Sequence, residues 1–361
     1  MDNSLLHGLP SNDVNLTQDN SSGFGLLPPI VDSDLQNLIN NITLGIAVFG
    51  IIANLSYLYV IAKIPRMRTV TNVYLLNLSV ADILFLIAMT TYNILILYLM
   101  IEVKNPTAAC IAVNAILVLP MNASVFTIAL VATDRYIAVC HPMKAKRMNT
   151  KKQAIWIIIL TWLIAPVFSI PSSLVCVIPD STTLVIVALI LQMGPFMLSM
   201  LTVIILYMLI VRQMHKRETN TTTKNLELIA KREKRQVITV LIIATFIFFG
   251  CVLPFQIKTF FELLIIFGKP MPISFQNYQT LITITIMLLF LNSAINPIIY
   301  KTFSSKYRLA FLEAFFCYKC IGSVPKPRRG SLSHSSTYST ERLAGHRIKI
   351  TNGKMKNGTW L

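Results

Sequence analysis

Residues 72–100 read NVYLLNLSVADILFLIAMTTYNILILYLM, an apolar run interrupted by one carboxylate, Asp82. This run is longer than the roughly 20 residues that an α-helix needs to cross the hydrocarbon of a bilayer. Together with six similar runs, it gives apolar segments at 38–62, 72–100, 108–140, 153–175, 183–211, 236–267 and 276–301. Because backbone groups find no hydrogen-bond partner in hydrocarbon, each segment is predicted to be helical. The sequence therefore predicts an all-α membrane protein with a seven-transmembrane helix bundle over residues 38–301.

The distribution of charge predicts how this bundle is oriented. The 361 residues include 32 Lys and Arg against 15 Asp and Glu, a net charge of +17. The first basic residue is Lys63, and most of the others gather between alternate apolar segments and in the C-terminal tail. This is the positive-inside pattern of membrane proteins and not a nucleic-acid-binding face. We expect a multi-pass plasma-membrane protein that binds no nucleic acid, with residues 1–37 outside the cell and a disordered cytoplasmic tail over 318–361.

The region after the seventh segment predicts a helix on the inner membrane leaflet. Aromatic residues recur there every four positions, at Phe303, Tyr307, Phe311 and Phe315. This spacing is typical of an amphipathic helix lying on lipid, and we place it over 303–317. Cys317 and Cys320 end this region and are candidate palmitoylation sites.

Both tails carry candidate modification sites. Asparagine sequons for glycosylation begin at Asn15, Asn20 and Asn41, on the predicted outside. In the C-terminal tail, Arg328-Arg-Gly-Ser331 matches a basophilic kinase pattern, so Ser331 is a candidate phosphorylation site. Phosphates in this tail would form an anionic patch for arrestin after a receptor kinase had acted.

Asp82 is the only acid deep within a central segment. An ionisable group in a membrane is costly, so it indicates either a carboxyl kept neutral by burial or a cation or proton site. Polar residues of other segments could complete a site for a monovalent cation; they are Asn54, Ser124, Asn292, Ser293 and Asn296.

Short motifs along the bundle resemble those of the rhodopsin-like (class A) G-protein-coupled receptors. In chain order they are Gly50-Ile-Ile-Ala-Asn54, Asn77-Leu-Ser-Val-Ala-Asp82, Asp134-Arg135-Tyr136, Trp156 with Pro166, Phe248 with Cys251-Val-Leu-Pro254, and Asn296-Pro297-Ile-Ile-Tyr300. The stretch from Asp134 to Ala145 resembles the somatostatin, opioid and galanin receptors. The resemblance implies a receptor that passes the binding of an extracellular ligand to heterotrimeric G proteins, with a peptide as the first expectation for the ligand.

The resemblance also implies roles for individual residues. The implied coupling residues are Asp134, Arg135, Tyr136, Met143, Tyr207 and Tyr300. Arg135 would pair with Asp134 at rest and engage the G protein when the sixth segment swings outward. An allosteric sodium site would be formed by the metal ligand Asp82 with Asn54, Ser124, Asn292 and Asn296. We expect no other cofactor and no enzymatic activity.

The ligand pocket is expected between the outer halves of the second, third, sixth and seventh segments. The candidate lining residues are Tyr92, Leu117, Met121, Phe255, Gln256, Thr259, Ile286 and Phe290. Leu117 stands where amine receptors carry an aspartate, so an ammonium ligand would lack its counter-ion. No lysine lies between Lys269 and Lys301 to bind retinal as a Schiff base. Lys258 and Glu262, four residues apart, either pair with each other or meet a charged ligand.

Two cysteines are predicted to form an extracellular disulfide. Cys110 opens the third segment and Cys176 follows the fourth, both on the predicted outside. An oxidising compartment favours their pairing. Few residues separate the fourth segment from Cys176, too few for a β-hairpin lid.

Three positions depart from the receptor family and leave an alternative function open. Val252 stands where the family usually has a tryptophan, Ser199 stands where it has a proline, and Lys234 stands where it often has an acid. An atypical or decoy receptor with weak or constitutive signalling is therefore the alternative. A transporter would show several intramembrane charges or an internal repeat, and neither occurs.

We expect elevated signalling without ligand, because the acid that would tether Arg135 at rest is replaced by Lys234. Second messengers in cells that express the full chain, with no ligand added, should exceed those of cells with an empty vector. Signalling at background would contradict this expectation.

Overall fold

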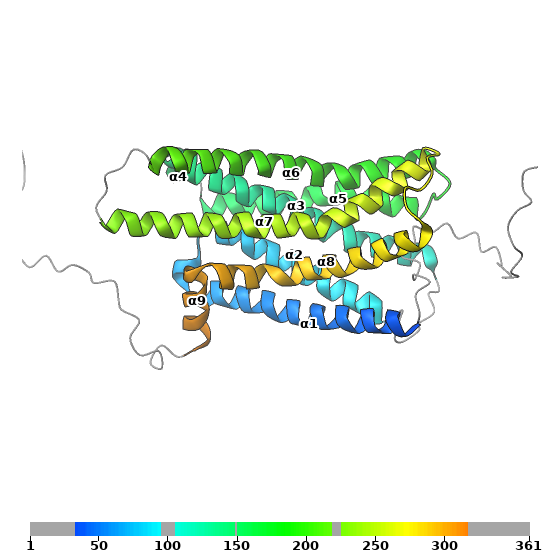
Figure 1. Cartoon of the computed structure of the whole chain (residues 1–361), viewed down its shortest axis with the longest axis horizontal. Helices are drawn as coiled ribbons and strands as arrows, with labels where there is room; N and C mark the ends of the chain where they lie inside the picture. Colours follow the sequence, from blue (N-terminus) through cyan, green and yellow to red (C-terminus); the bar gives the residue numbers. More distant parts are fainter. Residues whose placement is uncertain (1–32, 95–104, 149, 219–224, 317–361) are drawn as a thin grey trace, which may run out of the picture. The chain divides into compact units, whose positions relative to one another are not determined.

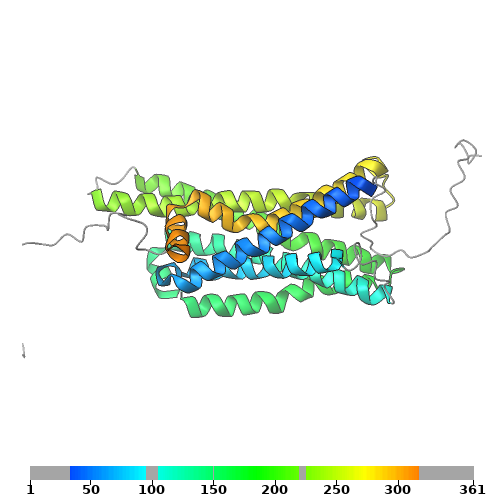
Figure 2. The same ribbon diagram turned by 90° about the horizontal axis from the view of Figure 1, so that it is seen from below.

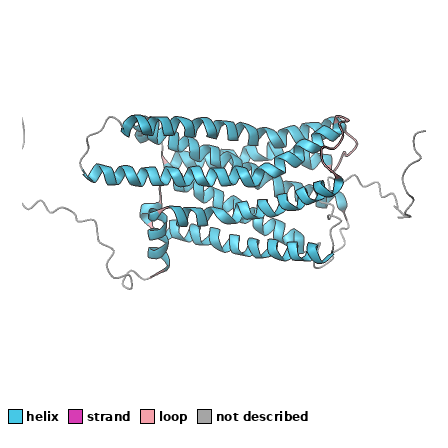
Figure 3. Ribbon diagram, in the orientation of Figure 1, coloured by secondary structure: helices cyan, strands magenta, loops and turns pink. Residues whose placement is uncertain are grey.

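The computed structural model describes residues 33–94, 105–148, 150–218 and 225–316, and these form helices joined by short loops, with no strand among them (Figure 3). The elements are α1 (Ser33–Lys63), η1 (Pro65–Met67), α2 (Val70–Asn93), α3 (Pro106–Cys140), α4 (Pro142–Met148), α5 (Lys151–Val175), α6 (Thr182–Glu218), α7 (Asn225–Ile266), α8 (Phe275–Phe303) and α9 (Ser305–Phe315). The expected tail over 318–361, most of the expected tail over 1–37, and the candidate sites Asn15, Asn20, Cys317, Cys320 and Ser331 lie outside the described residues.

Seven of these helices are long and apolar enough to cross a membrane, and they confirm the seven predicted segments. They are α1, α2, α3, α5, α6, α7 and α8. Helices α3, α6 and α7 are the longest, with 35, 37 and 42 residues. Because a crossing takes roughly 20 residues, these three extend beyond the hydrocarbon. The expected helical end of the second segment, residues 95–100, lies outside the described residues.

The long helices pack side by side, with α3 between its neighbours α2, α5 and α6 (Figure 1). Figure 2 shows α1 lying across α2 and α8, which it contacts along much of its length. We name the two ends of the bundle after features they carry. The disulfide end carries Cys110 and Cys176, and the α9 end carries α9 and the start of α2.

Five helices begin at a side chain that caps their backbone, and at the start of α6 this side chain is Ser181, which accepts from the Leu184 backbone N–H at 3.3 Å. Thr69, Asn105, Thr150 and Ser274 each accept a hydrogen bond from the backbone N–H three residues ahead, at 3.3, 3.0, 3.2 and 3.3 Å. The first turn of a helix has backbone N–H donors with no partner inside the helix. A capping side chain accepts from one of them and stabilises the protein by about 1 kcal/mol. These caps define where α2, α3, α5, α6 and α8 start.

The predicted disulfide between Cys110 and Cys176 is confirmed. Cys110 lies in the first turns of α3 and Cys176 directly follows α5, with their Cα atoms 5.9 Å apart. Residues 176–181 alone connect α5 to α6, and they contain turns and no strand. The disulfide therefore ties this short connection to α3 without a β-hairpin lid.

The amphipathic helix after the seventh span is present as α9, but its aromatic stripe is divided. Tyr307 and Phe311 are buried against α1 and α8, whereas Phe303 and Phe315 are about half exposed. The chain turns at Ser304, so Phe303 ends α8 and does not share a helix face with the others. Three of the four aromatic residues thus pack against protein, since the ring of Phe315 lies 5.3 Å from that of Tyr59 on α1, and lipid contact stays a prediction for α9.

Polar contacts fasten α9 to the start of the bundle. Lys63 Nζ donates to the Ala314 carbonyl at 2.6 Å, and Arg66 pairs with Glu313. Tyr307 donates its hydroxyl to the Asn72 side chain. Burial raises the pKa of Tyr307 to about 12, so the phenol remains protonated and keeps donating at neutral pH.

We predict that Gly50→Ala destabilises the protein, whereas Gly45→Ala in the same helix does not. A Cβ at Gly50 would lie 2.7 Å from the Ala294 Cβ and 2.9 Å from its Cα, so α1 and α8 would have to separate. A Cβ at Gly45 would meet nothing within 4 Å, and alanine there gains helix propensity. Thermal midpoints of the purified full chain measure both effects. Equal midpoints for the two variants would disprove the close approach.

Candidate ligand and coupling sites

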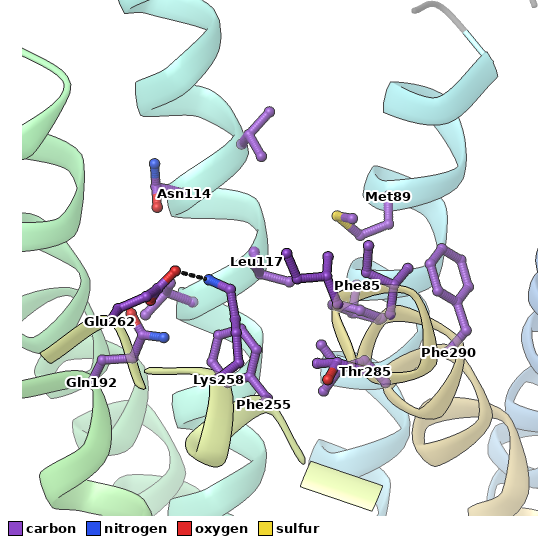
Figure 4. Close-up of a pocket in the computed structure, with 15 residues that line it drawn as sticks. Phe85, Met89, Asn114, Leu117, Gln192, Phe255, Lys258, Glu262, Thr285 and Phe290 are labelled. Carbon is purple, nitrogen blue, oxygen red and sulfur yellow. Dashed lines mark ion pairs between the residues drawn. The ribbon is translucent and has the colours of Figure 1, made fainter. Parts of the chain in front are cut away.

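A cavity of about 280 Å³ opens between α2, α3, α6, α7 and α8 towards the disulfide end (Figure 4). Its described lining residues are Phe85, Met89, Val113, Asn114, Leu117, Val118, Gln192, Phe255, Lys258, Glu262, Ile282, Thr285, Ile286, Leu289 and Phe290. Ligand pockets in proteins usually measure roughly 300–1,000 Å³, so this cavity suits a small ligand or the end of a larger one.

The structure brings half of the expected pocket residues to this cavity. Those that line it are Leu117, Phe255, Ile286 and Phe290. Those that do not are Tyr92, Met121, Gln256 and Thr259, of which the last three are buried among the helices. Thr259, for example, donates to the Phe255 carbonyl and accepts from Gln192 Nε2 at 3.2 Å. These side chains serve the packing between helices and not the lining.

Helical spacing could have identified several lining residues that sequence reasoning missed. Side chains three or four positions apart share a helix face. One turn before Leu117 lies Asn114, and one turn either side of Ile286 lie Ile282 and Leu289. Gln192 on α6 and Phe85 on α2 had no such neighbour among the expected residues, so only the fold reveals them.

The polar side chains of the cavity lie mostly on one side of it, with Thr285 on the other side near Phe290 (Figure 4). Lys258 pairs with Glu262 at 2.6 Å, which confirms the pairing of these two residues. The Tyr278 hydroxyl donates to Glu262 Oε1 at 3.1 Å and holds the carboxylate from α8. Figure 4 shows Gln192, Lys258 and Glu262 on one side and Phe85, Met89 and Phe290 on the other.

A second polar group lies at the middle of the bundle around Asp82, which is 2% exposed. Asn296 Nδ2 donates to Asp82 Oδ2 at 2.9 Å and joins α8 to α2. Asn54 Nδ2 donates to the Ser293 carbonyl at 2.8 Å and joins α1 to α8. Ser124 on α3 and Asn292 on α8 are also buried. All five expected residues of this site are therefore buried in the bundle, and the two hydrogen bonds link α1, α2 and α8.

The donor set of this group suits a hard monovalent cation. Asn54 Oδ1 and Asn292 Oδ1 are buried oxygens without a hydrogen-bond partner. An unsatisfied buried acceptor costs about 1–3 kcal/mol, and a cation would relieve that cost. One carboxylate with neutral oxygens carries too little negative charge for tight binding of a divalent ion. The residues thus fit the sodium ion that the resemblance implied.

Trp162, and not Trp156, joins α5 to the bundle. Trp162 Nε1 donates to Asn77 Oδ1 at 2.8 Å, and Asn77 Nδ2 donates to Thr127 Oγ1 at 2.8 Å. This chain links α5, α2 and α3. Trp156, which the motif reading singled out, is 62% exposed on the outer face of α5. The motif in this span pointed to Trp156 alone, whereas it is Trp162 that makes the hydrogen bond to the neighbouring helix.

The α9 end holds the expected coupling residues. Arg135 donates to Asp134 Oδ2 through Nη2 at 2.7 Å and through Nε at 3.0 Å. Thr71 Oγ1 donates to the same carboxylate oxygen from α2 at 2.5 Å. Tyr136 contacts His141 at 3.3 Å, and Met143 on α4 is 79% exposed. The arginine is therefore held within its own helix while Met143 stays open to a partner.

Two further tyrosines connect the α9 end to the middle of the bundle. The Tyr207 hydroxyl lies 3.2 Å from Thr245 Oγ1 and joins α6 to α7. Tyr300 is buried between Tyr57 and Tyr307, with ring centroids 5.5 and 5.7 Å away. This cluster of tyrosines holds the end of α8 against both α1 and α9.

The departures from the family motifs are part of the packed core. Val252 is fully buried, and Ser199 is 6% exposed. Pro195 lies inside α6 one turn before Ser199, so the helix keeps a proline at a shifted place. The side chain of Lys234 lies outside the described residues, so elevated basal signalling stays a prediction.

Comparisons with known proteins agree with this geometry. The family described as "7 transmembrane receptor (rhodopsin family)" matches residues 53–300. The chain is 26% identical over 300 residues to the neuromedin-U receptor 2 of Mus musculus, which covers 77% of this chain and 75% of that protein. It is 28% identical over 288 residues to the type-1 angiotensin II receptor of Bos taurus, which covers 74% of this chain and 77% of that protein.

Proposed function

The chain belongs to the rhodopsin family of seven-transmembrane receptors, and we propose that it binds a peptide in the cavity at the disulfide end and signals to a heterotrimeric G protein at the α9 end. The observation that carries this proposal is the placement of the two sites. The cavity and the Asp134–Arg135 pair lie at opposite ends of the same helix, α3. The relatives named for neuromedin U and angiotensin II, both peptides, favour a peptide ligand.

The protein is a multi-pass membrane protein of the cell surface, and we place its disulfide end outside the cell. The disulfide supports this orientation, because cystines persist in the oxidising exterior and not in the cytosol. The basic residues Lys144, Lys151 and Lys152 lie in or beside α4 at the other end, as the positive-inside rule requires.

The resting state is held by the contacts of Asp134. Its carboxylate accepts hydrogen bonds from Arg135 and from Thr71. The guanidinium of Arg135 is thereby occupied and does not bind a G protein. Ligand binding at the cavity shifts α7 relative to α3, and an outward swing of the α9 end of α7 would expose Arg135 to the G protein. Tyr207 and Tyr300, both buried, belong to the same proposed set of coupling residues.

The remaining partners and modifications follow from the same orientation. Glycans on the outer sequons, palmitoyl chains on Cys317 and Cys320, and phosphorylation of Ser331 by a kinase belong to the proposal. Arrestin would bind the phosphorylated tail through its negative charge. Asn41 lies within α1, and its side chain is exposed.

We predict that Arg135→Gln removes G-protein recruitment but leaves peptide binding within about threefold, because the arginine lies far from the cavity. Leu117→Trp fills the cavity and should lower peptide affinity by at least about tenfold. The full chain is expressed in cells, a peptide library identifies an activating peptide, and G-protein recruitment and binding are measured separately. Arg308→Gln, an exposed arginine on α9, serves as the control. Full signalling by Arg135→Gln would refute the coupling role.

We predict that sodium lowers agonist affinity in the wild type and that Asp82→Asn abolishes this effect. The carboxylate supplies the only negative charge of the polar group, and an amide cannot replace it. Agonist affinity is measured in membranes at equal ionic strength in sodium and in N-methylglucamine buffers. An equal response to sodium in wild type and variant would eliminate this site.

A further inference from the structure

The charges that line the outer cavity cancel each other. Among the described lining residues, Lys258 and Glu262 are the charged ones, and they pair at 2.6 Å. Their side chains are 18% and 21% exposed, so the pair is mostly shielded from water. The cavity therefore presents polar groups without net charge.

Two polar atoms of the lining have no hydrogen-bond partner. Glu262 Oε2 is buried and unpartnered, although Oε1 of the same carboxylate accepts from Tyr278. Thr285 Oγ1 is also buried and unpartnered, on a residue that is 2% exposed. A buried polar atom without a partner is costly. Glu262 Oε2 therefore favours a ligand that supplies a hydrogen-bond donor, whereas the Thr285 hydroxyl can donate or accept and favours any polar ligand group.

A singly charged ligand group would be disfavoured beside this pair. A cation would compete with Lys258 for Glu262, and an anion would compete with Glu262 for Lys258. In either case one charge of the three is left without its counter-charge in a largely apolar site, which is strongly unfavourable. An uncharged amide, in contrast, can donate to Glu262 Oε2 while the ion pair stays intact.

The other side of the cavity selects an apolar group. Phe85, Met89 and Phe290 lie opposite Gln192, Lys258 and Glu262 (Figure 4), and the rings of Phe85 and Phe290 meet edge to face with centroids 5.6 Å apart. An aromatic or branched side chain would bury its surface against them. The volume, about 280 Å³, holds such a side chain with one amide but not a whole peptide.

We propose that the cavity receives the uncharged end of a ligand, an amide with N–H donors next to an aromatic or branched apolar side chain, and selects against a single charge at that end. This inference rests on the proposed function, in which the cavity is the ligand site. The inference adds to the proposed function the chemistry of the part of the ligand that enters the helix bundle.

Three phenylalanine derivatives that differ in charge test the charge rule. They are N-acetyl-phenylalaninamide, which is neutral, N-acetyl-phenylalanine, which is an anion at neutral pH, and phenylalaninamide, which is largely a cation at pH 6. Purified full-length protein in lipid nanodiscs is titrated with each probe at pH 6, and the rise in thermal midpoint measures its affinity. For the wild type we expect the neutral probe to bind at least about tenfold more tightly than either charged probe.

Variants of the ion pair should change the preferred probe. Glu262→Gln removes the carboxylate partner of Lys258 from the cavity lining, so the anion should become the tightest probe. Lys258→Met leaves Glu262 as an unpaired anion, so the cation should become the tightest. Glu313→Gln removes the acid of the distant Arg66–Glu313 pair and should keep the wild-type ranking, as a control for the loss of a carboxylate.

A wild-type preference for a charged probe, or one ranking shared by all variants, would overturn the inference. Probe binding is measured without a G protein, so its failure is distinct from that of the proposed function. Peptide-induced signalling with no charge preference would leave the receptor function standing and remove this inference. If the probes rank as predicted but no peptide induces signalling, the charge preference of the cavity stands and the proposed receptor function fails.

Discussion

The structure depends on the lack of hydrogen-bond partners in the hydrocarbon of a membrane. Each polar side chain inside a span must find its partner on another helix or on its own backbone, or else bear the cost of having none. Asn54, Asn77 and Asn296 therefore do more than fill space, because each amide donates across a helix interface. Together these bonds tie α1, α2, α3 and α8, and Trp162 adds α5. Apolar packing between helices has no preferred direction, whereas these hydrogen bonds do. They therefore fix the positions of the helices relative to one another along their axes.

The fold was largely predictable from the sequence because the bilayer imposes a length on apolar segments and a sign on loop charges. Both are properties of composition and need no knowledge of packing. The Cys110–Cys176 bond could also be predicted, since it required only a shared oxidising side. The aromatic stripe of α9 was predicted less well. The aromatic residues do recur every four positions, but the chain turns at Ser304, so Phe303 belongs to α8. Tyr307 and Phe311 are buried in a cluster with residues of α1. Periodicity identifies a face and does not reveal what covers it.

The sites were predictable to different depths for the same reason. Asp134 and Arg135 are adjacent on α3, so a local sequence motif was enough to predict their pairing. Thr71 reaches Asp134 from the neighbouring helix α2 and could not be predicted from that motif. The cavity instead needs side-chain directions from five helices, and those depend on the rotation of each helix about its axis. Half of the expected lining residues point elsewhere for this reason, and Gln192 entered from a helix that had not been considered. Unpartnered oxygens at Asn292 and Glu262 are likewise visible only once the neighbours are placed.

The close approach of α1 and α8 at Gly50 has a consequence for how this sequence can change. The hydrogen of Gly50 and the methyl of Ala294 share one small volume, with the Leu86 side chain as its third wall. Substitutions at these positions cannot be independent, since the free energy of adding an atom at one depends on which atoms are present at the others. Gly50, Leu86 and Ala294 are therefore coupled. A larger residue at one of these positions is tolerated only when a smaller residue at another keeps their total volume unchanged. Two helices far apart in the chain thereby constrain each other's evolution through a contact that carries no charge and no hydrogen bond.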